Sequence, residues 1–555
     1  MYLYTYENLK KAAETEKGKT YIAEMEQKYK ERFEGVDLPV FNYSYQKMYA
    51  TNGNRVLHER IYFERRRKLK YLQLLAIQSD EYLEELEEIM SILCDEFSWV
   101  LPAHSYHVGK KKFEYNRVDL FSAETAMYLS ETVYVLGDKL SEDIRTRVKM
   151  SVKAKIVDIF ENNECAVDSW TNNWASVVGC GIGLSYLYLF PERFFLIKER
   201  LFGGMRRYLS GIDEEGYCSE GIGYWQYGFE FFAAFYDVYT QLYGDEEILH
   251  SEKVQNLLKY PQRSEMADGV HLPFADGGCK MFRIGRQCYY TVKNLFGENF
   301  AFYPTEFSLD DSEKALEYRV LYGLANENLK EKQKEKENSF YYKNAQVLLC
   351  KKQKYSFTAK GGHNDEMHNH NDLGCFQIVK NNKRVIVDIG AGEYTREFFG
   401  VGRYGDKVFV CGSQSHSVPI IDGALQKWGK EIEAEVLEVG SDSISLDISK
   451  AYGKERGQVC VEFICKEDGL RVKYACKNLK EGAIFRFVAD DDCKPRLVEG
   501  KAVVEGVTLE NKQGVVPTLS EWIYSNHQAE ATSAYLIDYA FSGEQIETEF
   551  FFKMD

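Results

Sequence analysis

The chain has 555 residues, which is too many for one hydrophobic core, so we expect two or three domains. Its apolar share of 45% and charged share of 28% are ordinary for a soluble globular protein, and only 9 prolines argue against long disordered linkers. The net charge of −16 argues against nucleic-acid binding, because that function needs a basic face and no Lys/Arg block near a motif supplies one.

The N-terminus, M-Y-L-Y-T-Y-E-N-L-K-K, lacks the basic and then apolar segments of a signal peptide. No apolar run reaches the length of about 18 residues that a membrane helix needs. The 13 cysteines show no tight spacing pattern and are expected to be reduced thiols. These features predict a cytoplasmic protein that binds neither membranes nor nucleic acids. Whether it forms a homo-oligomer stays open.

The first 330 or so residues are predicted to be helical. Apolar side chains recur every three or four residues in Ser79–Cys94 and in Ser141–Phe160, and each segment opens with a serine that can cap a helix, followed by two acids. Val177–Phe190 and Phe229–Leu242 are apolar nearly all round, as in helices that are buried on several sides. Many helices, some of them fully buried, fit a helical toroid or a large bundle.

After Phe340 the apolar period changes to two, which indicates β-strands. Apolar residues alternate in Val459–Cys465 and again in Leu470–Cys476, and the dipeptide Asp468-Gly469 between them is typical of a hairpin turn. Arg384–Gly390 is predicted to be a more buried strand. The C-terminal part therefore resembles an antiparallel β-sandwich.

The charged stretch Asn328–Asn338 is expected to be the exit from the helical part. We therefore predict an α+β multidomain protein. Its helical domain would span residues 1–335 and its antiparallel β-sandwich residues 336–555.

Histidines gather in the predicted β-domain. His368 and His370 stand two apart in H-N-H-N-D-L-G, and His416 follows in S-Q-S-H-S-V. Asp388 closes the apolar strand R-V-I-V-D-I-G, where a buried carboxylate needs a partner. Two histidines and one carboxylate with an open position suit Zn²⁺, and less specifically iron or manganese. The alternative is a hydrogen-bonded polar loop without a metal.

The motif W-T-N-N-W spans residues 170–174 and places two amides between tryptophans. The side chains of Asn172 and Asn173 can bind and neutralise a substrate carboxylate without adding a competing charge. The alternative is that one of them only caps the following helix. For Asn172, capping explains the residue about as well as carboxylate binding does.

A glycine-rich motif, Y-C-S-E-G-I-G-Y-W-Q-Y-G-F, contains Tyr224, Trp225, Gln226 and Tyr227. A tyrosine in such a lead-in to a helix can present its hydroxyl to a cleft, and it acts as an acid or a base if neighbouring cations lower its pKa. Core packing is the alternative, and it suits Trp225 better than Tyr224. A further motif, S-W-V-L-P-A-H-S, brings His104, which could line the same cleft or be a structural histidine.

Taken together, these motifs resemble the heparinase II/III family of polysaccharide lyases over most of the chain beyond about residue 60. One part of the resemblance is H-N-H-N-D-L-G-C-F with V-D-I-G, Tyr394, Arg403-Tyr404 and S-H-S-V-P-I in order. The other is N-N-W, followed about fifty residues later by E-G-I-G-Y-W-Q-Y-G. The resemblance implies an N-terminal (α/α) toroid, a C-terminal antiparallel β-sandwich and an active-site cleft between them.

The resemblance also implies β-elimination on a uronic acid, in which the C5 proton leaves, the 4-O-glycosidic bond breaks and an unsaturated uronate forms. Asn173 would bind the substrate carboxylate, with Asn172 as the fallback. Tyr224 would protonate the leaving oxygen and is also a candidate base, and His368 would be the opposing base.

The resemblance further implies that His370, Asp388 and His416 hold a structural divalent metal, expected to be zinc, that orders the loop beneath His368. The expected substrate is a uronate-containing oligosaccharide. Six residues are expected to contact it: His104, Asn172, Trp174, Trp225, Gln226 and Arg403.

Two departures from the family pattern matter. In some relatives a histidine follows the asparagine, and Trp174 stands there in this chain, which leaves the accepted uronate epimer open. Tyr227 competes with Tyr224, because Y-W-Q-Y offers both. The predicted cytoplasmic location favours imported oligosaccharides and exolytic cleavage.

Two other functions remain open. A glycoside hydrolase on an (α/α) barrel would use an acid/base pair of carboxylates. The candidates for that pair are Asp213, Glu214, Glu215 and Glu220. A non-catalytic, metal-stabilised glycan-binding protein would keep the aromatic cleft and the metal ligands. The lyase is the preferred prediction, because the hydrolase leaves the histidine cluster without a role.

Overall fold

The computed structural model describes residues 2–106, 113–277, 280–297, 302, 307, 312, 314–327, 338–395, 398 and 408–555. The chain forms two compact units. The first comprises Met1–Ile212, Trp225–Val254 and Arg283–Gln333, and the second comprises Asp213–Tyr224, Gln255–Phe282 and Lys334–Asp555. Two short segments from the predicted helical domain thus belong to the second unit, and the boundary at residues 335 and 336 stays a prediction.

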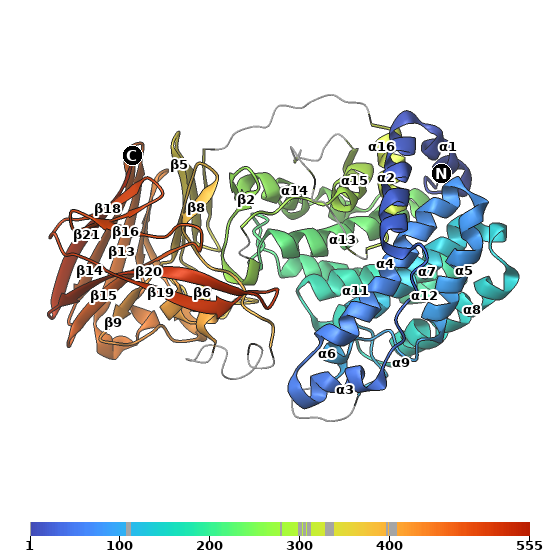
Figure 1. The fold of residues 1–555 in the computed structure, drawn as a ribbon, viewed down its shortest axis with the longest axis horizontal. Coiled ribbons are helices and arrows are strands. Elements are labelled where there is room, and N and C mark those ends of the chain that lie inside the picture. The colour runs from blue at the N-terminus through green and yellow to red at the C-terminus, as the bar shows by residue number, and fades with distance from the viewer. Residues whose placement is uncertain are drawn as a thin grey trace. The chain divides into compact units, whose positions relative to one another are not determined.

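The first unit is helical, and its helices run from blue through green to yellow in Figure 1. The helix Glu252–Ser264 lies mainly in the second unit. The α-helices, in chain order, are α1 (Tyr6–Glu14), α2 (Glu16–Phe33), α3 (Tyr43–Asn52), α4 (Val56–Gln78), α5 (Leu83–Asp95), α6 (Pro102–Ser105), α7 (Leu120–Leu136), α8 (Glu142–Val152), α9 (Asp158–Asn162), α10 (Ala166–Ser169), α11 (Asn173–Leu189), α12 (Pro191–Ser210), α13 (Ile222–Tyr243), α14 (Glu252–Ser264), α15 (Arg286–Phe296) and α16 (Glu317–Ala325). Among the described residues, none of these helices combines the length and apolar character that crossing a membrane requires.

Helix α11 is the buried centre of the first unit. It is apolar on all sides and packs against α7 and α12. A Cβ atom at Gly181 would stand 2.5 Å from the backbone of Ala123 in α7, so only glycine permits this approach of the two helices. The predicted segment Phe229–Leu242 lies within α13, and the predicted segment Val177–Phe190 lies within α11 except for Phe190, which caps its C-terminal end.

The two amphipathic helices predicted from serine caps are also present, with local departures. Ser79 caps a 3₁₀ turn, Asp80–Tyr82, and α5 follows it. Ser141 caps α8, as expected, and a single π-helical turn at Lys153–Val157 separates α8 from α9. The apolar stripe continues across that turn, because Ile156 and Phe160 remain buried.

The second unit is mainly β-structure. Its strands, in chain order, are β1 (Glu265–Ala267), β2 (Val270–His271), β3 (Ser339–Tyr342), β4 (Val347–Lys351), β5 (Tyr355–Lys360), β6 (His363–Asn364), β7 (Phe376–Lys380), β8 (Lys383–Ile386), β9 (Pro419–Ile421), β10 (Gly429–Glu433), β11 (Glu435–Val439), β12 (Ser443–Asp447), β13 (Gln458–Lys466), β14 (Gly469–Lys477), β15 (Gly482–Ala489), β16 (Arg496–Val498), β17 (Lys501–Val504), β18 (Val507–Asn511), β19 (Thr518–Ser525), β20 (Ala531–Ser542) and β21 (Gln545–Met554).

Two large antiparallel sheets pack face to face in this unit. One has the order β11-β12-β13-β14-β21-β18-β17-β16, and the other has the order β19-β20-β15-β8-β7-β5-β4-β3 with β9 paired to β15. Their inner faces meet through buried aromatic rings: Phe376 of the second sheet lies 5.3 Å from Phe463 and 5.4 Å from Phe552 of the first, between ring centroids. This shared core is that of a β-sandwich.

The predicted hairpin is confirmed in β13 and β14. Val461 stands opposite Tyr474 and Lys466 opposite Gly469, so the turn itself is Glu467-Asp468. Every second residue of β13 is buried, as its alternation predicted. The buried strand predicted at Arg384–Gly390 is shorter than expected, since β8 ends at Ile386.

The small hairpin of β1 and β2 lies against the sandwich. The Ser356 hydroxyl in β5 donates to the carbonyl of Met266 at 2.6 Å, and the Gln377 amide in β7 lies 3.4 Å from the Met266 sulfur. A 3₁₀ turn, Ala275–Gly277, follows this hairpin. The docking therefore brings Asp276 to the sandwich, although it lies far from it in the sequence.

Candidate active site

The loop between β6 and β7 carries His368 and His370, and a buried amide ties down its C-terminal end. The side chain of Gln426 accepts from the backbone N–H of Leu373 at 2.9 Å and donates to the Leu373 carbonyl at 2.8 Å. His368 itself has φ of 56°, in the left-handed region that non-glycine residues rarely adopt. Such a backbone persists only where its surroundings hold it, which is common at functional sites.

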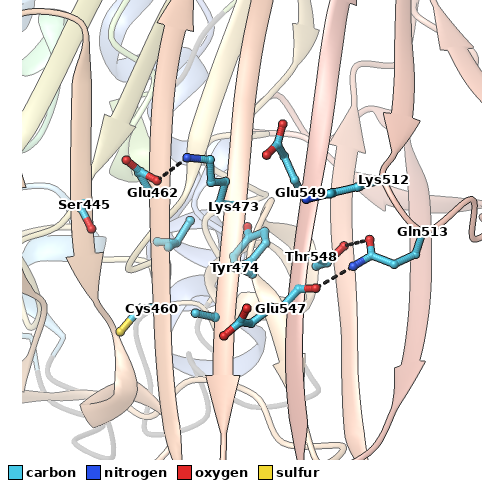
Figure 2. A pocket seen from close by; sticks show the side chains of 12 residues that line it. Ser445, Cys460, Glu462, Lys473, Tyr474, Lys512, Gln513, Glu547, Thr548 and Glu549 are labelled. Atoms are coloured by element: carbon cyan, nitrogen blue, oxygen red, sulfur yellow. Dashed lines mark hydrogen bonds and ion pairs between the residues drawn. The ribbon is translucent and has the colours of Figure 1, made fainter.

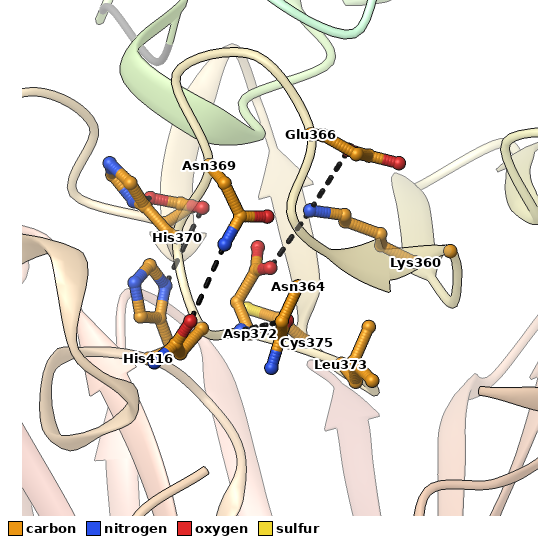
Figure 3. A network of polar contacts seen from close by, with 12 residues as sticks. Lys360, Asn364, Glu366, Asn369, His370, Asp372, Leu373, Cys375 and His416 are labelled. Carbon is orange, nitrogen blue, oxygen red and sulfur yellow. Dashed lines mark hydrogen bonds and ion pairs between the residues drawn. The ribbon is translucent and has the colours of Figure 1, made fainter. Parts of the chain in front are cut away.

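A buried lysine also holds this loop (Figure 3). The ammonium of Lys360 lies 2.8 Å from Asp372 and 3.5 Å from Glu366, so it binds carboxylates on both sides of the two histidines. Burial alone would lower the pKa of Lys360, but Asp372 and Glu366 outweigh it and raise that pKa above its ordinary value. The lysine therefore stays charged inside the unit.

Asp276 contacts both histidines. Its Oδ2 lies 2.5 Å from His368 Nδ1 and its Oδ1 lies 2.9 Å from His370 Nε2. The Tyr394 hydroxyl donates to the same Oδ2 at 3.2 Å. The side chain of Asp276 is fully buried, so these contacts take the place of water.

Tyr224 lies against His368. Their ring centroids are 4.6 Å apart, and the Tyr224 hydroxyl lies 3.0 Å from the Tyr394 hydroxyl. Because Tyr394 has one proton and donates it to Asp276, the bond between the two phenols is donated by Tyr224. Burial raises the pKa of Tyr394, and the neighbouring Asp276 raises it further.

Glu220 approaches the other ring nitrogen of His368, with Oε2 3.4 Å from Nε2. Burial raises the pKa of Glu220, partly offset by His368. Two glycines bring the two acids to the same imidazole. A Cβ on Gly221 (φ 91°) would stand 2.9 Å from the Cα of Gly277, and a Cβ on Gly277 would stand 2.4 Å from the Glu220 carbonyl oxygen.

The predicted metal ligands come together. His370 Nδ1 lies 3.8 Å from one oxygen of Asp388, and His416 Nδ1 lies 3.5 Å from the other. All three side chains are buried. Ligand atoms on a tetrahedral zinc with bonds of about 2.0–2.1 Å lie about 3.3–3.4 Å apart, so small movements would close this set around an ion.

Three atoms of this set lack hydrogen-bond partners within the described part of the chain: His370 Nδ1, Asp388 Oδ2 and His416 Nδ1. The far nitrogen of each ring is engaged, His370 Nε2 by Asp276 and His416 Nε2 by the Val410 carbonyl at 3.2 Å. Buried polar atoms without partners are costly, and a bound cation would satisfy all three. The donor set therefore fits a metal.

The electrostatics of the cluster favour a positive charge, supplied either by a proton on His370 or by a metal ion that displaces it. Burial alone would lower the pKa of His370, but Cys411 and Asp276 outweigh it and hold that pKa well above the ordinary value. Burial lowers the pKa of His416, partly offset by Asp388, which favours the neutral imidazole that binds metals. A second group of candidate ligands shares His370 and adds Asp276 and Cys411.

The asparagine motif lies in the first unit. The Asn172 side chain accepts from the backbone N–H of Trp174 at 3.2 Å, so Asn172 caps α11, as its alternative reading proposed. Asn173 is the first residue of α11 and is 5% exposed. Its side chain has no hydrogen-bond partner among the described residues, which leaves its amide free for a ligand.

Trp174 and His104 are neighbours in the same unit. Their ring centroids are 4.8 Å apart, and His104 Nδ1 lies 2.8 Å from Asp119 Oδ2. Burial would raise the pKa of Asp119, but His104 outweighs it and holds that pKa below its ordinary value. Trp174 also lines a small pocket of about 130 Å³ together with Trp170 and Arg117. Of the two predicted contact residues, Trp174 thus borders space that a ligand could use.

Three residues of the Y-W-Q-Y stretch differ in their surroundings. Trp225 is fully buried against Phe229 and Phe302, which corrects the expectation that it contacts substrate, because a fully buried indole packs the core. Gln226 accepts from the backbone N–H of Gly285 at 2.9 Å. The Tyr227 hydroxyl donates to Glu124. Arg403, the remaining predicted contact, lies outside the described residues.

Sequence reasoning missed Asp276 and underrated Glu220. Asp276 stands in F-A-D-G-G, where Asp-Gly usually marks a turn, and its approach to His368 depends on a hairpin docking across the unit. Glu220 was considered only as a hydrolase carboxylate. The glycines at 221 and 277 were the available signal, because glycine permits close crossing of two chain segments.

A separate hollow of about 570 Å³ lies on the outer face of the sheet that contains β13, β14 and β21 (Figure 2). Four of its polar side chains bind one another in pairs: Lys473 lies 2.9 Å from Glu462, and Gln513 contacts Thr548 at 2.7 Å. The histidine cluster does not contribute to it. We assign this hollow no part in the chemistry.

No protein-family model matches the chain, and no curated protein sequence matches it. Solved structures are similar to it. A heparan sulfate lyase mutant from Pedobacter heparinus has a TM-score of 0.60 and 11% identity, covering 97% of this chain and 88% of that one. Heparinase III has a TM-score of 0.60 and 12% identity, covering 94% and 79%. A chondroitin AC lyase from Streptomyces coelicolor A3, in complex with chondroitin sulphate, has a TM-score of 0.55 and 9% identity, covering 99% and 83%.

Likeness at this level of identity establishes the fold. It agrees with the helical first unit and the two packed antiparallel sheets of the second. The predicted fold class is thus confirmed: the chain has the fold of the heparinase III and chondroitin AC lyase structures, with an N-terminal (α/α) toroid and a C-terminal antiparallel β-sandwich.

Proposed function

We propose that this protein is a lyase that cleaves 4-O-linked uronic-acid glycans by β-elimination. The observation that carries the proposal is the pairing of Tyr224 with His368, 4.6 Å apart between rings, in a chain with the fold of three glycosaminoglycan lyases. A phenol and an imidazole side by side can supply the acid and the base that the reaction needs.

The reaction removes the C5 proton of the uronate, forms the C4–C5 double bond and expels the oxygen on C4. In our proposal His368 or Tyr224 takes the C5 proton, and Tyr224 protonates the leaving oxygen. Positioned acid/base groups contribute about 10²–10⁴-fold to such steps. Glu220 is not proposed as half of a hydrolase pair, because it and Asp276 contact opposite nitrogens of one imidazole.

A C5 proton is too weakly acidic to leave until the adjacent carboxylate is neutralised. We assign this role to Asn173, whose amide is free of hydrogen bonds among the described residues. A donor of this kind is worth roughly 3–4 kcal/mol in the transition state. Asn172 is the weaker candidate, since it already caps α11. Trp174 and His104 would contact the sugar beside them, and Arg403 and Gln226 keep their predicted role in binding it.

We propose that His370, Asp388 and His416 hold a zinc ion. Its role would be structural, ordering the loop that carries His368 and offsetting the buried charge of Asp388. Each of these three residues has one buried atom without a hydrogen-bond partner in the described chain, which supports this assignment.

We further propose exolytic cleavage of imported oligosaccharides by a cytoplasmic enzyme. A small set of product sizes from the start of the reaction would support exolytic cleavage. A ladder of intermediate sizes would contradict it.

The test is incubation with a panel of uronate oligosaccharides of heparan, hyaluronan, chondroitin and alginate type. A lyase yields a conjugated product that absorbs in the ultraviolet. The matched control is the same oligosaccharide with its carboxyl groups reduced to alcohols, which should not react, because the C5 proton then lacks its activating group. New reducing ends without ultraviolet absorbance would indicate a hydrolase and overturn the proposal. Binding without turnover across the panel would overturn it as well.

A further inference from the structure

The side chain of Asp276 touches both the proposed base and a proposed metal ligand. Its Oδ2 lies 2.5 Å from His368 Nδ1, and its Oδ1 lies 2.9 Å from His370 Nε2. No oxygen of this carboxylate is left for solvent, because the side chain is fully buried. A single acid thus binds two imidazoles that stand only two residues apart.

These contacts specify which nitrogen of each ring carries hydrogen. An ionised carboxylate only accepts hydrogen bonds, so each imidazole must present N–H to it. His368 then has its hydrogen on Nδ1 and a lone pair on Nε2. His370 has its hydrogen on Nε2 and a lone pair on Nδ1, the atom that faces Asp388 without a hydrogen-bond partner in the described chain.

We infer that Asp276 is a positioning residue that sets the tautomer of both histidines at once, so that His368 offers Nε2 to a proton and His370 offers Nδ1 to a cation. The inference rests on the proposed function and adds to it a residue that joins the base to the metal site. A carboxylate behind a metal-binding histidine is a frequent arrangement that fixes the ring and raises its basicity. Here the same carboxylate also fixes the second ring.

Left-handed backbone and a close glycine crossing fix the position of Asp276. Ala275 has φ of 62° and His368 has φ of 56°, so both sides of the contact use left-handed backbone. Gly277 crosses Gly221 so closely that a Cβ on either residue would clash. Strained backbone on both partners, with glycines at the crossing, indicates that the position of this carboxylate is maintained by its surroundings.

The test is Asp276→Asn. Asparagine keeps the shape of the side chain but offers one accepting oxygen and one donating amide, so one of the two imidazoles must turn a lone pair toward it. If the ring of His368 changes, we expect kcat to fall about 10³-fold or more with KM within about threefold of wild type. If the ring of His370 changes, we expect the zinc dissociation constant to rise about 10–100-fold. The matched control is Asp538→Asn, an aspartate of the same unit that binds Arg486 at 2.8 Å and lies outside the site.

The tautomers themselves are measured by long-range nitrogen–proton NMR of histidine-labelled, zinc-loaded protein, with signals assigned through His368→Ala and His370→Ala. The wild type should show His368 with hydrogen on Nδ1 and His370 with hydrogen on Nε2. Hydrogen on Nε2 of His368, or an Asp276→Asn protein whose tautomers, kcat and zinc affinity match wild type, would overturn the inference. The wild-type spectrum decides the matter even if the variant does not fold. A wild type that makes no unsaturated product would contradict the proposed function and leave this measurement intact.

Discussion

Tyr224 and Tyr227 lie one helical turn apart on α13, yet their hydroxyls have different partners. Tyr224 bonds to Tyr394 at 3.0 Å, and its ring lies 4.6 Å from that of His368 at a tilt of 36°. The hydroxyl of Tyr227 donates to Glu124, an acid that is buried and also accepts from Tyr128 at 2.9 Å. The phenol of Tyr224 thus lies beside the imidazole of His368, which is why we assign the catalytic role to Tyr224 and not to Tyr227.

We predict that Tyr224→Phe lowers kcat by about 10²–10⁴-fold with little change in KM, because the lost hydroxyl acts on the leaving oxygen in the transition state. Tyr227→Phe is the matched control. It should cost about 1–3 kcal/mol of stability, since Glu124 loses a donor, and leave kcat near wild type. Initial rates by ultraviolet absorbance and denaturant unfolding measure the two effects. A normal rate in Tyr224→Phe, or a loss of turnover in Tyr227→Phe alone, would remove Tyr224 from the mechanism.

The loop between β6 and β7 owes its shape to groups buried beneath it. Lys360 binds Glu366 before His368 and Asp372 after His370, and Gln426 binds the backbone at Leu373. Removing one partner of a buried pair leaves an uncompensated charge, which is far more costly than losing a surface pair. The loop should therefore be sensitive to changes at positions that never touch substrate.

We predict that Lys360→Met destabilises the protein by about 3–5 kcal/mol and also weakens metal binding, because Asp372 and Glu366 lose their counter-charge under the histidine loop. The matched control is Lys427→Met, which breaks the exposed pair with Glu455 (3.1 Å) and should cost under about 1 kcal/mol. Chemical denaturation and metal analysis provide the readouts. Equal effects of the two substitutions would show that Lys360 does not support the loop.

The regular elements were predictable because their signals are local. The alternation in Val459–Cys465 follows from the two faces of a strand. Ser141 caps α8, which begins at the next residue. Boundaries were less accurate: the π turn at Lys153–Val157 interrupts one helix without a sequence signal that we identified. The apolar period within a segment indicates which face is buried, but it does not locate the residue at which the helix or strand ends.

At the level of the whole chain, the change of apolar period from about three and a half to two predicted the order of a helical part and a sandwich. The cluster of His370, Asp388 and His416 was predictable as a set, because histidines are few and the motifs kept their spacing, and its metal stays a proposal. Asp276 was not, since its contact with His368 bridges 92 residues and depends on the docking of a hairpin. Trp225 was misplaced because an aromatic residue in a glycine-rich motif can face a cleft or the core, and the sequence does not distinguish them.

The final prediction concerns the stability of the protein as a function of bound metal. An ion that binds only the folded state stabilises it by about 2.7 kcal/mol at a free concentration one hundred times its dissociation constant. For a unit of roughly 250 residues this corresponds to a shift in Tm of about 5–10 °C. We therefore expect a chelator to lower the Tm of the zinc-loaded wild type by that amount, and to leave the already lowered Tm of His370→Ala unchanged, because that variant no longer holds the ion.

The matched control is His363→Ala, in β6 directly before the loop that carries His370, where the histidine accepts a backbone N–H from Asp365 at 3.2 Å. This variant should bind zinc and respond to the chelator as the wild type does. Because metal loss acts through His370, Asp388 and His416 together, His416→Ala combined with His370→Ala should lower Tm by less than the sum of the single changes. A wild type that contains no metal, takes up no zinc and shows the same Tm with and without chelator would refute the metal site, while the buried, unpartnered atoms of these three residues would then require another explanation.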